Sequence, residues 1–541
     1  MSFNIADLFE RAVDAVPDRT ALIIGDRRTT YAELDQAANR LAHALGERGI
    51  GVGDHVGIYG QNSLEWVQAM LAAFKLRAVP ININFRYVED ELAYLFDNAQ
   101  LKALVFDRQY AHRVASVRRS TPRLEHLVVV DDGTEPDAQV LGSLGAVPIA
   151  RLVAEGSAER GFGARSPDDH YVLYTGGTTG LPKGVVWRHE DVFFALGGGC
   201  DAYTNERVTT DRQLADRAAA TETPMITLCI PPLMHGAAQW ATMRLWFEGG
   251  TVVFLPRFDP VEVWATIERQ RVNTAMITGD AMGRPMVEAL EANLDRFDLS
   301  SLMVLTSSAA VFSPTVKDRY LELLPNLLII DAIGSSESGH NGMVVLHKGE
   351  TAMKGGGPTV AAGADAVVLD DDLVPVRPGS GVVGRLGRGG NIPLGYFGDE
   401  AKTAATFLTA ADGRRYAVPG DFATVEADGT ITLLGRGSVC INSGGEKIYP
   451  EEVESALKAH PAVFDALVVG VDDEGWGQRV AAVVQPRPDR PAPTLDQLDA
   501  HCRTHIAGYK VPRQLHLVDQ VVRSPAGKPD YRWAMAVAGG A

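Results

Sequence analysis

Cysteine is scarce in this chain of 541 residues, and long apolar runs are missing. The 4 cysteines lie far apart, with no C-x-x-C spacing, at Cys200, Cys229, Cys440 and Cys502. This argues against a disulfide scaffold and a cysteine zinc site, and we expect a reducing, cytoplasmic location. Because no stretch approaches about 20 uninterrupted apolar residues, we expect no integral membrane segment.

Positive charge is also in short supply. Lys and Arg total 51 against 68 Asp and Glu, a formal net charge of −17. A surface this acidic argues against a general binder of nucleic acid or anionic membranes. Residues 1–19 carry Asp7, Glu10 and Asp14 among apolar side chains. A secretory signal would be basic and then continuously apolar, so we predict a surface helix here.

The composition and the order of local patterns indicate an α/β protein. Hydrophobic residues make up 46% and charged residues 22%, as in globular proteins. At ~150 residues per domain the length allows two to four domains. Thr30 with Glu33 forms a capping box before a helix, and Ser63 can cap another. Short β-rich runs lie between helices (101–106, 127–130 and 251–255), as in stacked α/β layers.

The pattern changes after residue 435. Pro450 can begin a helix that Pro461 stops, and residues 464–471 and 480–484 have the composition of strands. A proline-rich connector follows, and then Thr494 and Gln497 form another capping box. The glycine-rich residues 435–438 would connect two domains with few apolar contacts. We predict a large N-terminal domain of stacked α/β layers (1–435) and a small α+β C-terminal domain (436–541).

The strongest motif is the glycine-rich segment 174–184, YTGGTTGLPKG. Its glycines let backbone N–H groups turn toward phosphate oxygens, its threonines add donors, and Lys183 adds a positive charge. A Walker loop is excluded, since Pro182 stands at its second glycine position and Gly184 at its Ser/Thr position. A glycine-rich surface turn is the alternative. The length and composition of the motif favour phosphate binding.

This segment and those after it resemble the adenylate-forming enzymes, the family of acyl-CoA synthetases, luciferases and peptide-synthetase adenylation domains. The other motifs follow in the family's order over nearly the whole chain: PLMHG at 232–236, SAA at 308–310, DAIGSSE at 331–337, Gly420-Asp421, Gly435-Arg436, SGGE at 443–446 and Gly527-Lys528. The resemblance implies that ATP activates a carboxylic acid as an acyl-AMP, and that coenzyme A then takes the acyl group.

The resemblance also implies site residues. The implied catalytic residues are Lys528 at the reacting carboxylate and α-phosphate, Glu337 holding Mg²⁺ with the hydroxyl of Thr175, His235 at the acyl site, and Lys183. Preorganised positive charge suits a step that concentrates negative charge, and Mg²⁺ prefers oxygen ligands. The implied residues for ATP and coenzyme A are Thr175, Gly176, Gly177, Thr178, Thr179, Gly180, Lys183, Ser308, Ala309, Ala310, Asp331, Ile333, Gly334, Ser335, Ser336, Asp421, Arg436, Lys528, Ser443, Gly444 and Gly445.

Several positions depart from the family pattern. Gly176 replaces a serine, and Ile333 replaces an aromatic residue expected to stack on adenine. Ser438 replaces an Asp or Lys at the pivot about which the resemblance implies that the small domain rotates. The chain is similar to one branch of acyl-CoA synthetases, the actinobacterial ligases for sterol side-chain carboxylates and related fatty acids. That similarity implies a large apolar acid, with residues 277–282 and 307–312 as pocket walls.

Other interpretations stay open. An adenylating enzyme could load a carrier-protein thiol, and a protein of this fold could bind nucleotide or lipid without catalysis. Taken alone, Lys528 reads as a tail lysine, Asp421 as a turn residue and His235 as a core histidine. A serine hydrolase is rejected, because G-x-S-x-G would need glycine where Ser338 stands. We expect small-molecule partners (the acid, ATP and coenzyme A) and no nucleic acid, and leave a homodimer open.

Overall fold

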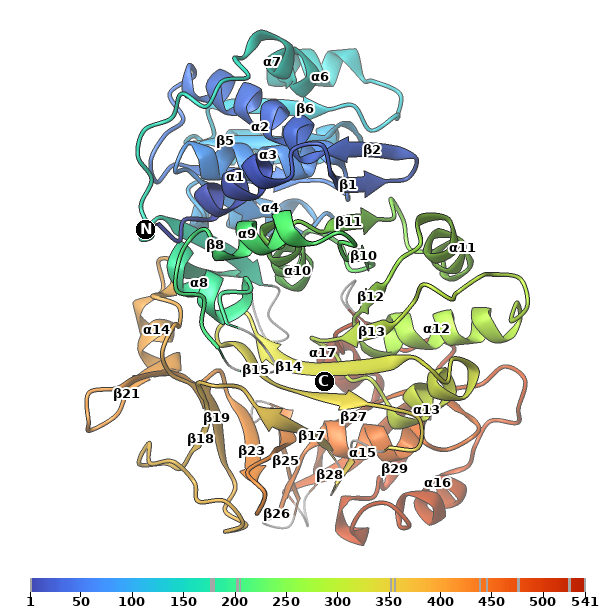
Figure 1. The fold of residues 1–541 in the computed structure, drawn as a ribbon. Coiled ribbons are helices and arrows are strands. Elements are labelled where there is room, and N and C mark those ends of the chain that lie inside the picture. Colours follow the sequence, from blue (N-terminus) through green and yellow to red (C-terminus); the bar gives the residue numbers. More distant parts are fainter. Residues whose placement is uncertain are drawn as a thin grey trace. The chain divides into compact units, whose positions relative to one another are not determined.

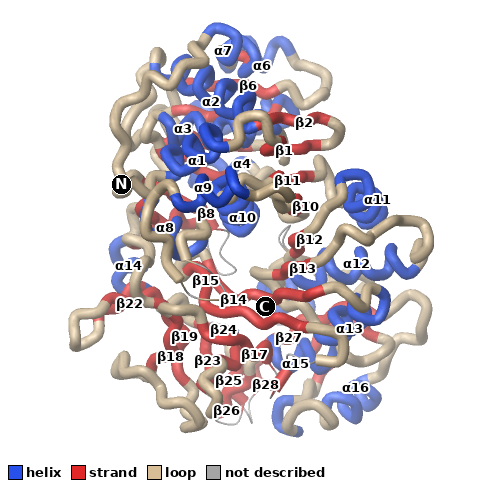
Figure 2. Tube along the Cα trace, in the orientation of Figure 1, coloured by secondary structure: helices blue, strands red, loops and turns tan. Residues whose placement is uncertain are grey.

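The computed structural model describes residues 2–175, 181–200, 204, 206–350, 353–354, 357–436, 439–443, 446–473, 477–523 and 527–539. The chain forms two units (Figures 1 and 2). The first unit contains Met1–Met276, Asp298–Leu302 and Asn391–Ala405, and the second contains Ile277–Phe297, Met303–Gly390 and Thr406–Ala541. Among the described residues, no helix is both long enough and apolar enough to cross a bilayer.

One sheet of the first unit has the strand order β20-β9-β8-β4-β3-β5-β6-β7. Its inner strands pair in parallel, whereas β8 and β9 are antiparallel. Two of the predicted strands are confirmed as β5 and β6. The bounds are β3 His55–Tyr59, β4 Val79–Asn82, β5 Ala103–Asp107, β6 His126–Val130, β7 Val147–Pro148, β8 His170–Thr175, β9 Lys183–Arg188 and β20 Gly395–Tyr396.

A second layer of the first unit has the order β2-β1-β11-β10-β12, parallel except for the β1–β2 hairpin. The predicted strand at 251–255 is confirmed as β11. The bounds are β1 Thr20–Ile24, β2 Arg27–Thr30, β10 Ile226–Cys229, β11 Thr251–Phe254 and β12 Thr274–Ile277. The helices of this unit are α1 Ile5–Ala15, α2 Tyr31–Gly46, α3 Leu64–Lys75, α4 Glu89–Asn98, α5 Ala111–Val117, α6 Ala138–Leu144, α7 Ile149–Glu155, α8 His189–Leu196, α9 Gln213–Ala220, α10 Gly236–Phe247 and α11 Pro260–Gln270, with α14 Glu400–Thr406 at the unit boundary.

Both predicted N-caps are confirmed. Thr30 Oγ1 accepts a hydrogen bond from the N–H of Glu33 at 3.2 Å, and Ser63 Oγ accepts one from the N–H of Trp66 at 3.0 Å. The helix after Ser63 is buried on nearly all sides. In α3 every residue except Glu65 is buried, Lys75 included, because α3 lies between the sheet and other helices. Tertiary packing therefore covers its polar side too.

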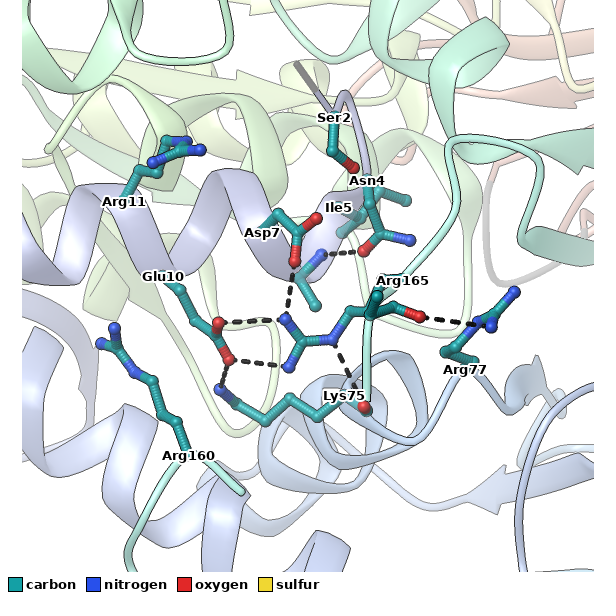
Figure 3. Close-up of polar contacts among 12 residues, drawn as sticks. Ser2, Asn4, Ile5, Asp7, Glu10, Arg11, Lys75, Arg77, Arg160 and Arg165 are labelled. Carbon is teal, nitrogen blue, oxygen red and sulfur yellow. Dashed lines mark hydrogen bonds and ion pairs between the residues drawn. The ribbon is translucent and has the colours of Figure 1, made fainter. Parts of the chain in front are cut away.

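The helix predicted at the N-terminus is α1, and its two faces have different neighbours. Ile5, Leu8 and Phe9 are buried. On the other face, acidic side chains meet basic ones from distant segments (Figure 3). Lys75 Nζ lies 2.6 Å from Glu10 Oε1, and Arg165 lies 2.6 Å from Asp7 and 2.9 Å from Glu10. Two acidic residues of this helix, Asp7 and Glu10, thus belong to a partly buried ion network.

The sheet of the second unit runs β13-β14-β15-β17-β24-β23-β19-β22-β21, with β16 on β17 and β18 on β19. Helix α12 (Gly279–Glu291) follows β12 in the chain, and helix α13 (Pro314–Leu323) follows β13. The bounds are β13 Val304–Ser307, β14 Leu328–Ser335, β15 Gly339–Leu346, β16 Met353–Lys354, β17 Gly357–Ala362, β18 Ala366–Leu369, β19 Gly384–Arg388, β21 Phe407–Thr409, β22 Arg415–Ala417, β23 Asp421–Val425 and β24 Ile431–Arg436.

Residues after 440 build a smaller sheet of order β26-β25-β28-β27, with β29 on β28. The helix that begins at Pro450, the capping box at Thr494 and the two predicted strands are confirmed. The bounds are β25 Ile441–Ser443, β26 Glu446–Ile448, α15 Pro450–Lys458, β27 Val463–Asp473, β28 Gly477–Pro486, α16 Leu495–Cys502, β29 Gln514–Leu517 and α17 Tyr531–Val537. Their apolar side chains form two clusters, which consist entirely of residues 441–538.

Candidate active site

The two ends of the glycine-rich motif are adjacent strands in the first unit. Thr175 ends β8, Lys183 begins β9, and the two residues are directly paired in the antiparallel register. The next pair is Tyr174 with Gly184, where a Cβ on the glycine would lie 2.7 Å from the tyrosine ring. Only glycine therefore fits at 184. The pairing places a hydroxyl-bearing residue and a lysine opposite each other on neighbouring strands.

Asn82, the last residue of β4, joins this strand to the histidine motif. Its amide donates to the carbonyl oxygens of Tyr174 at 2.8 Å and Met234 at 2.7 Å, and its Oδ1 accepts from Tyr174 N–H at 2.8 Å. All three residues are buried. Asn82 belongs to none of the predicted motifs. The one signal for it is a polar residue at the end of an apolar strand.

His235 is the N-cap residue of α10 and is half-buried. Two side chains hold the loop before it: Leu233 N–H donates to Asn62 Oδ1 of a distant segment at 2.8 Å, and Gln239 of α10 itself donates to the carbonyl oxygen of Leu233 at 2.8 Å. A Cβ on Gly236 would lie 2.3 Å from Leu173 Cδ2. The histidine motif is thus packed against β8, the strand that leads into the glycine-rich loop.

In the second unit, residues 308–310 follow β13 and pass over the start of α12. Ser307 Oγ accepts a hydrogen bond from Gly279 N–H at 3.1 Å, and a Cβ on Gly279 would lie 2.3 Å from the carbonyl oxygen of Val311. Ala309 has a φ of 67°, in the left-handed region, where a side chain is strained. This loop and the first turn of α12 are therefore one closely packed surface, and both were predicted to line the substrate site.

Asp331 is buried in β14 and is paired in register with Ser307 of β13. Its Oδ2 lies 2.5 Å from Lys317 Nζ, a buried partner that the sequence analysis missed and that no sequence pattern indicates. Burial raises the pKa of Asp331, and Lys317 opposes that rise. The Asp331 carboxylate is therefore already paired with the ammonium group of Lys317. Ile333, two residues on, packs against the hydrophobic cluster that contains Val360 and Ile431.

The segment 334–337 forms the end of β14 and the turn into β15 (Figure 1). A Cβ on Gly334 would lie 2.3 Å from the carbonyl oxygen of Gly339, so the hairpin closes only around glycine. Ser335 Oγ and Ser338 Oγ are 2.9 Å apart and fix the turn. Ser336 and Glu337 are half-buried within it. Glu337 and Thr175 each offer the oxygen ligands that Mg²⁺ prefers beside nucleotide phosphates, so the residue types fit the predicted ion.

Asp421 and Arg436 are directly paired across the antiparallel strands β23 and β24. Gly420, just before Asp421, has a φ of 106°, which favours glycine. Two residues predicted to contact ribose or phosphate thus come together from different motifs.

Lys528 is half-buried beside Gly527, which is closely packed. Gly527 has a φ of 71°, and a Cβ there would lie 2.7 Å from Ala281 Cβ and 3.3 Å from the carbonyl oxygen of Thr278. The C-terminal motif therefore touches the segment 277–282, predicted to be a pocket wall. Ser443, predicted to lie on the thiol side, ends β25 and pairs with Gly477.

Some predicted residues lie outside the described part of the chain, and their roles stay predictions: Gly176, Gly177, Thr178, Thr179, Gly180, Ser438, Gly444 and Gly445. Among the described residues, no group of three or more His, Cys, Asp or Glu is arranged to hold a metal ion.

Two family models match this chain. The model of the AMP-binding enzyme matches residues 9–397, and that of the AMP-binding enzyme C-terminal domain matches residues 452–528. The prediction of a large N-terminal and a small C-terminal domain in an α/β protein is thereby confirmed, while the border between residues 435 and 436 stays a prediction.

Individual relatives match over nearly the full length. The 3-oxocholest-4-en-26-oate–CoA ligase of Rhodococcus rhodochrous is 55% identical over 539 residues, 99% of this chain and 96% of that protein. A medium/long-chain-fatty-acid–CoA/3-oxocholest-4-en-26-oate–CoA ligase of Mycobacterium tuberculosis is 56% identical over 534 residues, again 99% and 96%. The crystal structure of an anthranilate CoA ligase with anthranoyl-AMP has a TM-score of 0.83 at 24% identity, covering 99% of this chain and 97% of that one, which shows a shared fold.

Proposed function

The chain belongs to the AMP-binding enzyme family and is an AMP-forming acyl-CoA ligase, and we propose that its acid substrate is large and apolar, a medium- or long-chain fatty acid or a steroid side-chain carboxylate. ATP and coenzyme A are its other substrates. Relatives at 55% and 56% identity that carry these substrates in their names support the proposal. Ile277, Met282 and Phe312 in the predicted pocket segments are apolar and buried, which also agrees with it.

The contact of the Lys528 motif with the segment 277–282 is the observation that carries the mechanism. In the first step a carboxylate oxygen attacks the α-phosphorus of ATP and the bond to pyrophosphate breaks, which gives acyl-AMP. We assign Lys528 to stabilise the negative charge that gathers on these oxygens. Lys183 and Thr175 bind the phosphates, and His235 contacts the acid. In the second step the thiolate of coenzyme A attacks the acyl carbon, and AMP leaves.

Glu337, with the hydroxyl of Thr175, would hold Mg²⁺, which would neutralise phosphate charge when bound. Asp421 would accept hydrogen bonds from the ribose hydroxyls, with Arg436 beside it. The residues 308–310, Asp331 and 333–336 would form the adenine side. Since Lys317 Nζ already lies 2.5 Å from the Asp331 carboxylate, we assign Asp331 a structural role, in which it holds the backbone on the adenine side in place.

We further propose that residues 436–541 form a mobile domain that turns at Ser438 between the two steps and presents 443–446 to the thiol. Two hydrophobic clusters drawn only from residues 441–538 support an independent core, and the C-terminal family model falls in the same region. A cytoplasmic location agrees with the use of ATP and coenzyme A and with four free cysteines. A homodimer stays open.

A panel of acids tests the substrate proposal. Acids from short fatty acids to steroid side-chain carboxylates are compared by AMP release that depends on coenzyme A. We expect kcat/KM to rise with apolar size and to be greatest for long-chain or steroid acids. Activity confined to short or aromatic acids would contradict the proposal. A phosphopantetheinyl carrier protein replaces coenzyme A in a parallel arm, and faster loading of the carrier would favour the alternative acceptor.

A further inference from the structure

We propose that Arg523 and Asp465 are positioning residues for the adenylation step, and that they hold the chain segment that presents Lys528. The inference rests on the proposed function, since it takes Lys528 as the catalytic group. Neither residue belongs to a motif that the sequence analysis identified, and both lie among the residues after 440.

The two side chains form a bidentate ion pair. Arg523 Nε donates to Asp465 Oδ2 at 2.6 Å, and Arg523 Nη2 donates to Asp465 Oδ1 at 2.8 Å. Asp465 lies on β27, an outer strand of the small sheet that pairs with β28 along its length, so the pair ties the C-terminal segment to this sheet. Only 17% and 15% of the two side chains are exposed, so water weakens this pair less than it weakens a surface pair.

The same guanidinium also reaches the residue before Lys528. Arg523 Nη1 donates to the carbonyl oxygen of Gly527 at 3.1 Å, and Arg523 forms a backbone bridge with Pro529. The planar guanidinium therefore contacts both β27 and the backbone just before Lys528, while the main chain of Arg523 bridges to Pro529 just after it. Since Gly527 is itself packed against Thr278 and Ala281, a shift of this backbone would move Lys528 relative to the predicted acid pocket.

The charges around the pair keep it ionised. Burial lowers the pKa of Arg523, but its bonds to Asp465 and the nearby charges of Glu454 and Asp280 outweigh this and raise it. Burial raises the pKa of Asp465, but Arg523 and Lys458 outweigh this and lower it. A lysine at 523 would keep the charge, but its single ammonium lacks the planar fork that contacts Asp465 and the Gly527 carbonyl together.

A purely structural salt bridge is the rival explanation, and the two half-reactions distinguish it. A loss of folded protein would lower both half-reactions equally. A displaced Lys528 would lower only formation of acyl-AMP, because the thiol step does not use it. Misplacing a catalytic group by about 1 Å costs on the order of 100-fold.

The test compares Arg523→Lys, Arg523→Gln and Asp465→Asn with the wild-type protein. Acid-dependent ATP–pyrophosphate exchange measures the first step, and release of AMP from supplied acyl-AMP by coenzyme A measures the second. We expect exchange to fall by about 100-fold through kcat, with the KM for ATP unchanged, and thiolysis to change by less than about threefold. Arg503→Gln is the control for loss of a bidentate pair away from Lys528, because Asp499 on α16 and Arg503 at its C-cap form a more exposed bidentate pair at 2.6 and 3.0 Å. We expect it to leave both steps unchanged.

Equal losses in both steps, a loss in thiolysis alone, or unchanged exchange would each overturn the inference. If Arg523→Gln fails to fold, Arg523→Lys gives the same comparison with the charge retained. The double variant Arg523→Gln/Asp465→Asn should be no slower in exchange than the worse single variant, since both act through one pair. Absence of exchange in the wild-type protein would instead contradict the proposed function.

Discussion

Replacing Asn82 with alanine should loosen the strand that leads into the glycine-rich loop. Asn82 makes three hydrogen bonds to the buried backbone, two with Tyr174 at 2.8 Å and one with Met234 at 2.7 Å. The parallel ladder between β4 and β8 pairs Ile81 with Val172. One residue further along β4, the side chain of Asn82 bonds to the backbone of β8 at Tyr174.

The size of the effect follows from these contacts. A hydrogen bond contributes about 1 kcal/mol net, and buried groups left without partners cost about 1–3 kcal/mol each. Three lost bonds should therefore lower the free energy of local opening by about 3 kcal/mol, or roughly 150-fold in the opening equilibrium. The glycine-rich motif and the histidine motif share this residue, so we also expect kcat/KM for ATP to fall.

Amide hydrogen exchange followed by mass spectrometry measures this directly. Peptides that cover 171–175 in Asn82→Ala should exchange roughly 100-fold faster, while peptides from the second unit stay unchanged. Asn39→Ala is the matched control, because Asn39 is buried in the same unit and donates to the carbonyl oxygen of Ala158 at 2.8 Å. Exchange at 171–175 that rises less than about threefold, or equally in the control, would refute the reasoning.

Four further predictions concern charged residues. Lys75→Met should cost about 3–5 kcal/mol, seen as a lower unfolding midpoint, because it leaves the carboxylates of Glu10 and Asp35 buried without the ammonium group now 2.6 and 2.7 Å away; an unchanged midpoint would contradict this. Burial raises the pKa of Glu10, but Lys75 and Arg165 outweigh that effect and hold the pKa below its ordinary 4.5. The contribution of Glu10 to folding stability is therefore complete above pH about 4.5 and is lost as the pH falls through the lowered pKa. Acid titration of the unfolding midpoint checks this, and a loss that begins near neutral pH would disprove it. Lys528→Ala should abolish ATP–pyrophosphate exchange and spare thiolysis, and loss of both half-reactions would show this role to be wrong. Glu337→Ala should raise the Mg²⁺ concentration needed for exchange, and an unchanged Mg²⁺ titration would contradict its role as a metal ligand.

The local features of this protein could be predicted because their causes are local. A capping box needs only Thr30 and Glu33 three residues apart, and Pro450 begins a helix wherever its neighbours permit. The motif from Thr175 to Lys183 carries its glycines and charge within one short segment. For these reasons the sequence determined the α/β class, the presence of a small C-terminal domain and the family.

The partners that hold the site residues could not be predicted in this way. Asn82 and Tyr174 are separated by 92 positions, and Asp465 and Arg523 by 58. Lys317 is closer to Asp331, 14 positions away, but meets it only because α13 packs beside β14. Such pairs depend on strand order and register, which are set by packing over the whole sheet. Only the tertiary structure decided which buried polar groups support the residues that the motifs identify.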